Sequence, residues 1–174
     1  MAMLLALALS ACHKEEQAVE GVARNAARAE QQAQANATER DAERAELVKI
    51  PLPTKSLYID IHDPSQWQNP FISAGADTLD LRVVMEDANP STATAGTFLR
   101  PEGARRQELQ VRPSDLARAV AALPARAWPY GRVVAIAESP EADRKNRAAV
   151  RRNVEFAIQK LNDLGVVVDE WPAR

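Results

Sequence analysis

The chain has 174 residues, which suits one modest domain with or without a tail and is too short for two large domains. Lys and Arg together number 22 against 24 for Asp and Glu, so no positive excess favours nucleic acid or an anionic membrane surface as a partner. Cys12 is the only cysteine, which excludes an internal disulfide bond and a metal site built from several cysteines.

The first twelve residues combine a short apolar run with small residues that end in the lone cysteine. Residues 3–9 are too few to cross about 30 Å of hydrocarbon as a helix. The stretch Leu9-Ser10-Ala11-Cys12 resembles the lipobox of bacterial lipoproteins, in which an aliphatic residue and two small residues precede an obligate cysteine. The resemblance implies that lipid, including palmitate, anchors the mature protein to a membrane through Cys12. The alternative is a cytosolic helix that contains this stretch by chance.

The same resemblance implies a location. Residues 1–11 are expected to be a signal peptide, and the remaining chain is expected to be periplasmic. His13, rather than Asp, follows the cysteine, which favours the outer membrane by the sorting rule for such proteins. Signal peptides carry a basic residue before their apolar run, and none precedes it here. We therefore expect the true start of the protein to lie upstream of Met1.

Residues 12–49 are predicted to form a stalk. After Cys12 the chain is nearly all Ala, Glu, Gln and Arg, which favour helix, but the positions on its apolar stripe are mostly alanines with little to bury. We expect a partly helical, partly disordered segment that spans at most about 50 Å, at about 1.5 Å per residue. A coiled coil along the alanine stripe, which would oligomerise the protein, is the alternative. Pro51 and Pro53 end the helix.

Apolar patterning predicts five strands and two helices in the remaining domain, residues 50–174. The strands are expected at residues 56–61, 78–86, 106–112, 131–139 and 166–171, and the helices at 114–123 and 143–164. This order contains two strand-helix-strand units, which favour parallel pairing with right-handed crossovers. We therefore predict an α+β fold, a small mixed β-sheet of four to five strands with two helices on one face.

Four short stretches resemble the periplasmic domain of the ExbD and TolR family: "IPLPT", "SLYIDI", "WPYGRVVAI" and "LNDLGVVV". The resemblance covers about residues 50–170. It implies two helices on one face of a small sheet, in a periplasmic domain that binds peptidoglycan or another envelope protein and forms a homodimer. The family also has a transmembrane helix with an essential Asp that couples it to a proton-driven motor. Cys12 and the stalk stand in its place here, so motor coupling is not carried over.

Asp60, His62 and Asp63 form the only cluster of a histidine with carboxylates. In a strand, Asp60 and His62 point to the same face, where they could share a metal ion or a proton. A solvated strand face that runs into a turn is the alternative. The sequence contains no P-loop, nucleophile elbow or metalloprotease histidine pair, and we expect no cofactor.

The linker at residues 87–105 is long enough to suggest a function of its own. Charged residues crowd its ends, and the carboxylates among them could act as a glycosidase pair: Glu86, Asp87, Glu102, Arg105 and Arg106. A charged loop rim explains the same residues without catalysis.

Five basic residues open the second predicted helix: Arg144, Lys145, Arg147, Arg151 and Arg152. Positive charge at a helix N-terminus opposes the helix dipole, so the cluster is a candidate docking face for an acidic partner or an anionic glycan. A solvated face balanced by neighbouring carboxylates is the alternative.

Trp128 and Tyr130 precede the central strand, and Trp171 closes the last one. If these two strands are neighbours, their aromatic side chains could meet as a core plug or as a contact patch.

Together these patterns favour a non-enzymatic periplasmic lipoprotein that binds an envelope protein or peptidoglycan. The second hypothesis is an immunity or inhibitor lipoprotein that blocks a secreted toxin. The third is a hydrolase that uses His62 with nearby carboxylates.

Overall fold

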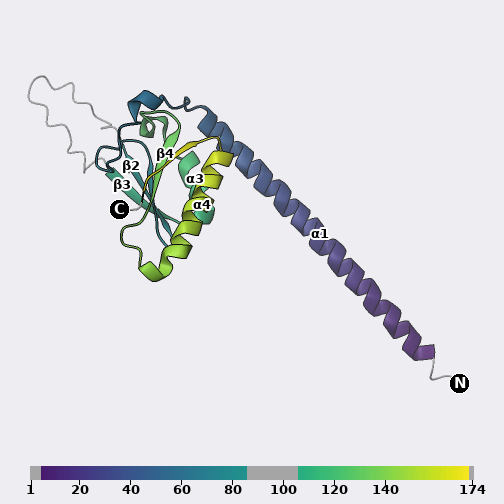
Figure 1. The fold of residues 1–174 in the computed structure, drawn as a ribbon. Helices are drawn as coiled ribbons and strands as arrows, with labels where there is room; N and C mark the ends of the chain where they lie inside the picture. The colour runs from purple at the N-terminus through teal and green to yellow at the C-terminus, as the bar shows by residue number, and fades with distance from the viewer. Residues whose placement is uncertain (1–4, 86–105, 173–174) are drawn as a thin grey trace, which may run out of the picture. The chain divides into compact units, whose positions relative to one another are not determined.

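The structure is a computed structural model that describes residues 5–85 and 106–172, with side chains described from residue 24 onward. The chain divides into two compact units, Met1–Asp41 and Ala42–Arg174. Helix α1, Leu5–Val48, makes up the described part of the first unit, and the strands of the described chain all belong to the second (Figure 1).

The described part of the stalk is helical. From residue 24 to residue 41, every side chain of α1 is exposed except that of Ala37, which is half-buried. Because its apolar positions are alanines, this part of the helix is held by its own hydrogen bonds and by the helix propensity of its residues.

The last turn of α1 belongs to the second unit. Leu47 is 0% exposed and Ile50 is 6% exposed, so both are part of the core. Arg132 donates a hydrogen bond from Nη1 to the carbonyl oxygen of Leu47 at 3.1 Å. Carbonyls at a helix C-terminus lack intrahelical partners, and a cation there also interacts favourably with the helix dipole. The helix ends at Val48, ahead of Pro51, as predicted.

Five strands form one mixed sheet in the order β3-β2-β1-β4-β5. The strands are β1 (Phe71–Ala74), β2 (Leu79–Val84), β3 (Arg106–Val111), β4 (Val133–Glu138) and β5 (Val167–Glu170). Strand β1 pairs antiparallel with β2 and parallel with β4, β2 pairs antiparallel with β3, and β4 pairs parallel with β5. The carboxyl ends of β1, β4 and β5 therefore lie together at one end of the sheet.

Two helices cover one face of this sheet: α3 (Leu116–Ala121) and α4 (Arg147–Asp163). Short 3-10 helices lie at Lys55–Leu57 (η1), Pro113–Asp115 (η2), Ala125–Ala127 (η3) and Arg144–Asn146 (η4). The predicted α+β class, with a five-stranded mixed sheet, is confirmed. The two strand-helix-strand units are also present, but β1 and β2 lie between β3 and β4, so only β4 and β5 are direct neighbours.

The prediction of a strand at residues 56–61 is wrong. The segment forms η1 and tight turns, closed by local hydrogen bonds such as Tyr58 N to Lys55 O at 3.2 Å and Ile61 N to Tyr58 O at 2.9 Å. Tyr58 is buried, while Leu57 and Ile59 are 51% and 44% exposed, the reverse of the expected alternation. Packing of the tyrosine ring therefore decides the conformation, rather than burial of the aliphatic side chains.

The first strand is instead β1, in a stretch where the sequence predicts no strand. It is four residues long, buried on both faces and bounded by Pro70 and Gly75, so it shows no alternation to detect.

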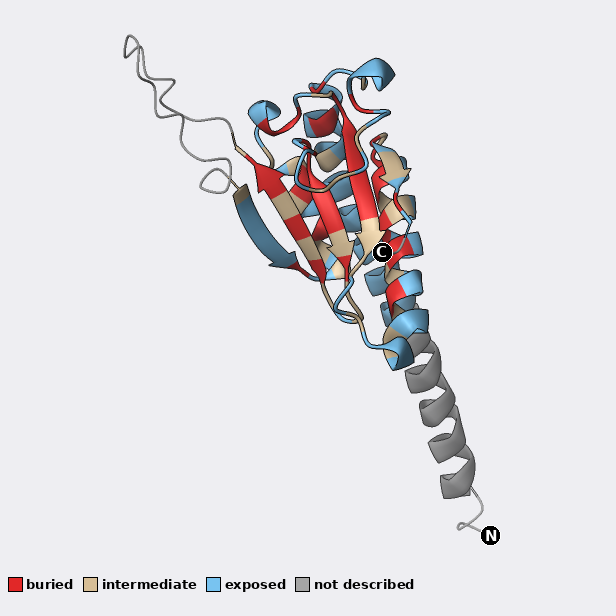
Figure 2. Cartoon of the chain, turned by 60° about the vertical axis from the view of Figure 1, so that its left-hand side comes forward, coloured by how far each residue is buried: buried red, intermediate tan, exposed pale blue. Residues whose placement is uncertain are grey.

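The central strands of the sheet are largely buried (Figure 2), and alternating residues along them belong to two separate cores. Ile72, Leu81, Val134 and Ile136 pack against α3 and α4 on what we call the helix face. Phe71, Val133 and Ala135 point to the opposite side, which we call the aromatic face because Tyr58, Trp67 and Trp171 cover it.

The side chain of Cys12, Glu86 and the whole 87–105 linker, which contains Asp87, Glu102 and Arg105, lie outside the described residues. In the part of the chain that is described, no helix combines the length and the apolar character needed to cross a membrane.

Candidate functional site at the carboxyl ends of the parallel strands

An aromatic cluster occupies the aromatic face of the sheet. The ring of Trp67 lies at its centre, with centroid distances of 5.8 Å to Tyr58, 5.3 Å to Tyr130 and 5.4 Å to Trp171. Trp171 in turn lies 5.2 Å from Phe71. Most of these pairs are edge-on or tilted, the geometry that aromatic quadrupoles favour. The cluster therefore joins the segment before β1 to the residue after β5.

A buried amide holds this segment to the sheet. Asn69 is 0% exposed, and its Nδ2 donates to the carbonyl oxygens of Gly131 at 2.7 Å and Val133 at 2.8 Å. Its Oδ1 accepts a hydrogen bond from the backbone N–H of Tyr130 at 2.9 Å. All three partners are backbone groups of the chain that enters β4, so a single side chain fixes two segments sixty residues apart in the sequence.

Arg82 and Trp67 also help to hold the segment before β1 against the sheet. Arg82 on β2 donates a hydrogen bond to the carbonyl oxygen of Pro64, and its guanidinium carbon lies 4.7 Å from the ring centroid of Phe71. Trp67 donates from Nε1 to the carbonyl oxygen of Pro70 at 3.1 Å. These contacts place Pro64 beside Phe71 at the rim of the sheet.

An apolar cleft opens where β1, β4 and β5 end. Its volume is about 240 Å³. Large aromatic and proline side chains surround two small residues of adjacent strands, and the lining consists of Pro64, Phe71, Ser73, Ala137, Glu138, Pro140, Trp171 and Pro172. Ser73 and Ala137 are direct partners in the parallel register of β1 and β4. These two side chains are small and leave room for the cleft above them, while the rings of Phe71 and Trp171, which pack against each other, form part of its wall.

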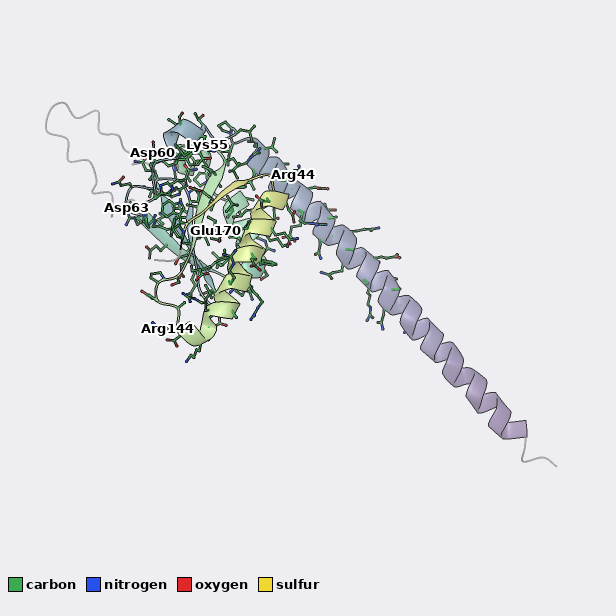
Figure 3. All side chains as sticks on the ribbon, viewed as in Figure 1. Arg44, Lys55, Asp60, Asp63, Arg144 and Glu170 are labelled. Carbon is green, nitrogen blue, oxygen red and sulfur yellow. The ribbon has the colours of Figure 1, made fainter. Side chains whose placement is uncertain are left out.

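A smaller polar hollow lies next to the cleft. Its volume is about 90 Å³, and its lining combines the loop after β4 with the start of the second helix: Glu138, Ser139, Pro140, Ala142, Asp143, Arg144, Arg147 and Val150. Glu138 and Pro140 line both cavities, so only this short segment separates them. Arg144 lies at this end of the domain, and Lys55 lies at the opposite end (Figure 3).

The basic residues at the start of α4 fall into two groups. Lys145 pairs with Asp143 at 3.1 Å, and Arg151 pairs with Glu155 at 3.0 Å and also with Glu170. Hydrogen bonds from Arg151 to Glu170 and Glu155 raise the pKa of the Arg151 guanidinium.

Arg144, Arg147 and Arg152 are exposed and have no ion-pair partner within the described ranges. Only Arg144 and Arg147 of this second group line the polar hollow.

The aromatic residues that the sequence singled out, Trp128 and Tyr130, lie in different parts of the fold. Trp128 is 4% exposed and packs in the core on the helix face, whereas Tyr130 belongs to the aromatic cluster. Trp128 precedes β4 and Trp171 follows β5, and because these strands are parallel the two indoles lie at opposite ends of the sheet. The expected meeting of Trp128 with Trp171 does not occur, and Trp171 packs against Trp67 and Phe71 instead.

Asp60 lies in a turn, and His62 and Asp63 lie in irregular chain, so the expected common strand face for Asp60 and His62 is absent. Asp63 accepts a hydrogen bond from the backbone N–H of Ser65 at 2.8 Å, and the ring of His62 lies 6.0 Å from that of Trp171. Among the described residues, no group of three or more His, Cys, Asp or Glu side chains is arranged to hold a metal ion.

Sequence reasoning missed the cleft itself. Its lining comes from four separate stretches between Pro64 and Pro172, and no local pattern joins them. The one feature that could have indicated the cleft is the predicted parallel pairing, because open α/β sheets bind ligands at the carboxyl ends of their parallel strands.

The lining of the cleft is mostly apolar. It offers one hydroxyl and one carboxylate among mostly apolar side chains, the composition of a site that accepts an apolar group and orients it with few polar contacts. No protein-family model, curated protein or solved structure matches this chain significantly.

Proposed function

We propose that this protein is an envelope lipoprotein, anchored through Cys12, whose globular domain binds an apolar segment of another envelope protein without catalysing a reaction. The apolar cleft over Ser73 and Ala137, lined by Phe71 and Trp171, is the observation that carries the proposal. The location rests on the lipobox-like stretch that ends at Cys12.

The chemistry of the cleft favours a protein partner over peptidoglycan. Peptidoglycan presents hydroxyl, amide and carboxylate groups, which need hydrogen-bond partners when water is removed. Ser73 and Glu138 are the only polar side chains in the lining, whereas two aromatic rings and three prolines offer contact to an apolar side chain. Aromatic and proline-lined grooves of this kind suit extended, proline- or aromatic-bearing segments.

Photo-crosslinking in cells tests the binding site. A photoreactive phenylalanine analogue at the exposed position Pro172, on the cleft rim, is expected to form a covalent adduct with a protein partner. The same analogue at Gln159, which is exposed on α4, is the control and is expected to form none. The adduct should disappear when Ala137→Leu fills the cleft. Adducts of equal yield from both positions, or label from Pro172 only in the peptidoglycan fraction, would contradict the proposal.

Detergent partition tests the anchor separately. The protein expressed in its native envelope is expected to enter the detergent phase, and the Cys12→Ser variant is expected to remain in the aqueous phase, because the acyl chains supply the affinity for lipid. If Cys12→Ser partitions as the unaltered protein does, the lipoprotein assignment fails while the cleft proposal stands.

A further inference from the structure

The polar hollow beside the cleft identifies the chemistry of the partner more closely. We infer that the segment bound in the cleft carries an acidic side chain, which Arg144 and Arg147 recognise, close to its apolar side chain. This inference rests on the proposed function, because it assumes that the cleft is the binding site.

The two cavities are neighbours and can serve one ligand. Glu138 and Pro140 contribute to both linings, so the apolar cleft and the polar hollow lie on the two sides of one short stretch of chain. An extended peptide advances about 3.3 Å per residue, so an acidic side chain within about four residues of the apolar one can reach the hollow.

The hollow has an excess of unpaired positive charge. Asp143 is neutralised by Lys145 at 3.1 Å, which leaves Glu138 as the one carboxylate of the lining that has no cationic partner in the described part of the chain. The lining also contains two exposed guanidinium groups, those of Arg144 and Arg147, so its positive charges outnumber the remaining negative one. A carboxylate from a partner balances this difference, and guanidinium groups bind carboxylates in a bidentate manner.

The other cations of the α4 N-terminal region do not contribute in the same way. Arg151 is engaged by Glu155 and Glu170, and Arg152 lines neither cavity. Arg152 is exposed on the same helix and is likewise without an ion-pair partner among the described residues, so it provides a control of equal charge.

Selection of peptides by the full chain tests the inference. A library of random dodecapeptides displayed on phage is expected to yield binders in which Asp or Glu lies within about four residues of Trp, Phe, Leu or Pro. For a selected peptide, the double variant Arg144→Glu with Arg147→Glu should weaken binding about tenfold, and rising salt should reduce the affinity. Arg152→Glu should leave the affinity unchanged.

The outcomes separate the two proposals. Peptides that lose binding with Ala137→Leu but keep it with the double Arg variant overturn the acidic-partner inference and leave the cleft proposal intact. The same is true of selected peptides without acidic residues. A selection that enriches no peptide above background, or only peptides indifferent to Ala137→Leu, counts against both. The double Arg variant should fold normally, because both side chains are exposed and acidic residues are favourable at the start of a helix.

Discussion

Asn69 shows how one polar side chain positions the aromatic cluster. It is completely buried, yet both of its amide donors and its oxygen are used by backbone groups that lead into β4. Its loss removes three hydrogen bonds to backbone groups. The carbonyl oxygen of Gly131 still accepts a hydrogen bond from the N–H of Val133 at 2.8 Å, but each lost hydrogen bond costs free energy.

Asn69→Ala is therefore expected to lower the free energy of unfolding by about 3 kcal/mol. Asn69→Asp should be at least as damaging, because a carboxylate cannot donate to the carbonyl oxygens of Gly131 and Val133. Urea denaturation measures both. Gln68→Glu, at an exposed neighbouring position, is the control and should change little. Equal stability of Asn69→Asp and the unaltered protein would contradict the described hydrogen bonds.

Ionisation of Tyr58 makes the stability of the protein depend on pH. Burial, and secondarily the negative charge of Asp169, raise the pKa of the Tyr58 hydroxyl above its usual value of 10.0. The folded state then holds the phenol proton more tightly than the unfolded state does. This contribution to stability is complete below pH 10 and is lost as the pH rises above it.

The free energy of unfolding should accordingly fall as the pH rises above about 10, and Tyr58→Phe should remove part of that fall. Denaturation at a series of pH values between 8 and 11 gives the slope for each protein. Identical slopes would mean that Tyr58 ionises equally readily in the folded and unfolded states.

Two glycines with positive φ provide a matched pair at turns. Gly131 has φ of 85°, and an added Cβ would lie 2.7 Å from the carbonyl oxygen of Leu52 and 2.8 Å from the Cα of Pro53. Gly165 has φ of 76° and closes α4 in a Schellman motif, but an added Cβ meets only Arg132 side-chain atoms at 4.0 Å.

Gly165→Ala should cost about 1 to 2 kcal/mol of unfolding free energy for its backbone conformation alone. Gly131→Ala should cost more than about 3 kcal/mol, because a backbone clash is added to the same strain. Thermal or urea denaturation of the two variants decides this order. The reverse order would show that the chain after α1 does not pack against Gly131 as described.

At the scale of elements, the sequence predicts regular patterns better than short or doubly buried segments. β2, β3, α3 and α4 each begin and end within four residues of their predicted bounds, because they show alternation or helical periodicity. β1 has neither, and the apparent alternation at residues 56–61 belongs to turns anchored by Tyr58. The side chains that decide these two segments make long-range contacts, which a local pattern does not contain.

The exposed part of α1 predicts an uneven distribution of protection. Amides of residues 24–41 should exchange with solvent about 100-fold faster or more than those of Val150–Leu161 in α4, because that part of α1 buries no large apolar side chain whereas α4 does. Hydrogen exchange followed by mass spectrometry measures the difference. Comparable protection in the two helices would indicate that α1 pairs with another helix in solution.

At the scale of the whole molecule, the sequence identified part of the candidate site and missed its centre. The basic residues Arg144 and Arg147 were predicted as a docking face, and they line the polar hollow. Prediction of the cleft would have required knowing that the segments around Pro64, Ala137 and Trp171 converge at one end of the sheet. That convergence depends on the strand order, in which the first strand joins the antiparallel and parallel halves.

The affinity of the domain for its crosslinked partner, measured with Ala137→Leu, tests the central claim most directly. A leucine side chain at position 137 would occupy the cleft and should reduce the affinity at least about tenfold. The melting temperature of the variant should stay close to that of the unaltered protein. Ala148→Leu adds the same atoms at an exposed position of α4 and should leave the affinity unchanged. An unchanged affinity in Ala137→Leu, with the fold intact, would contradict binding at the cleft.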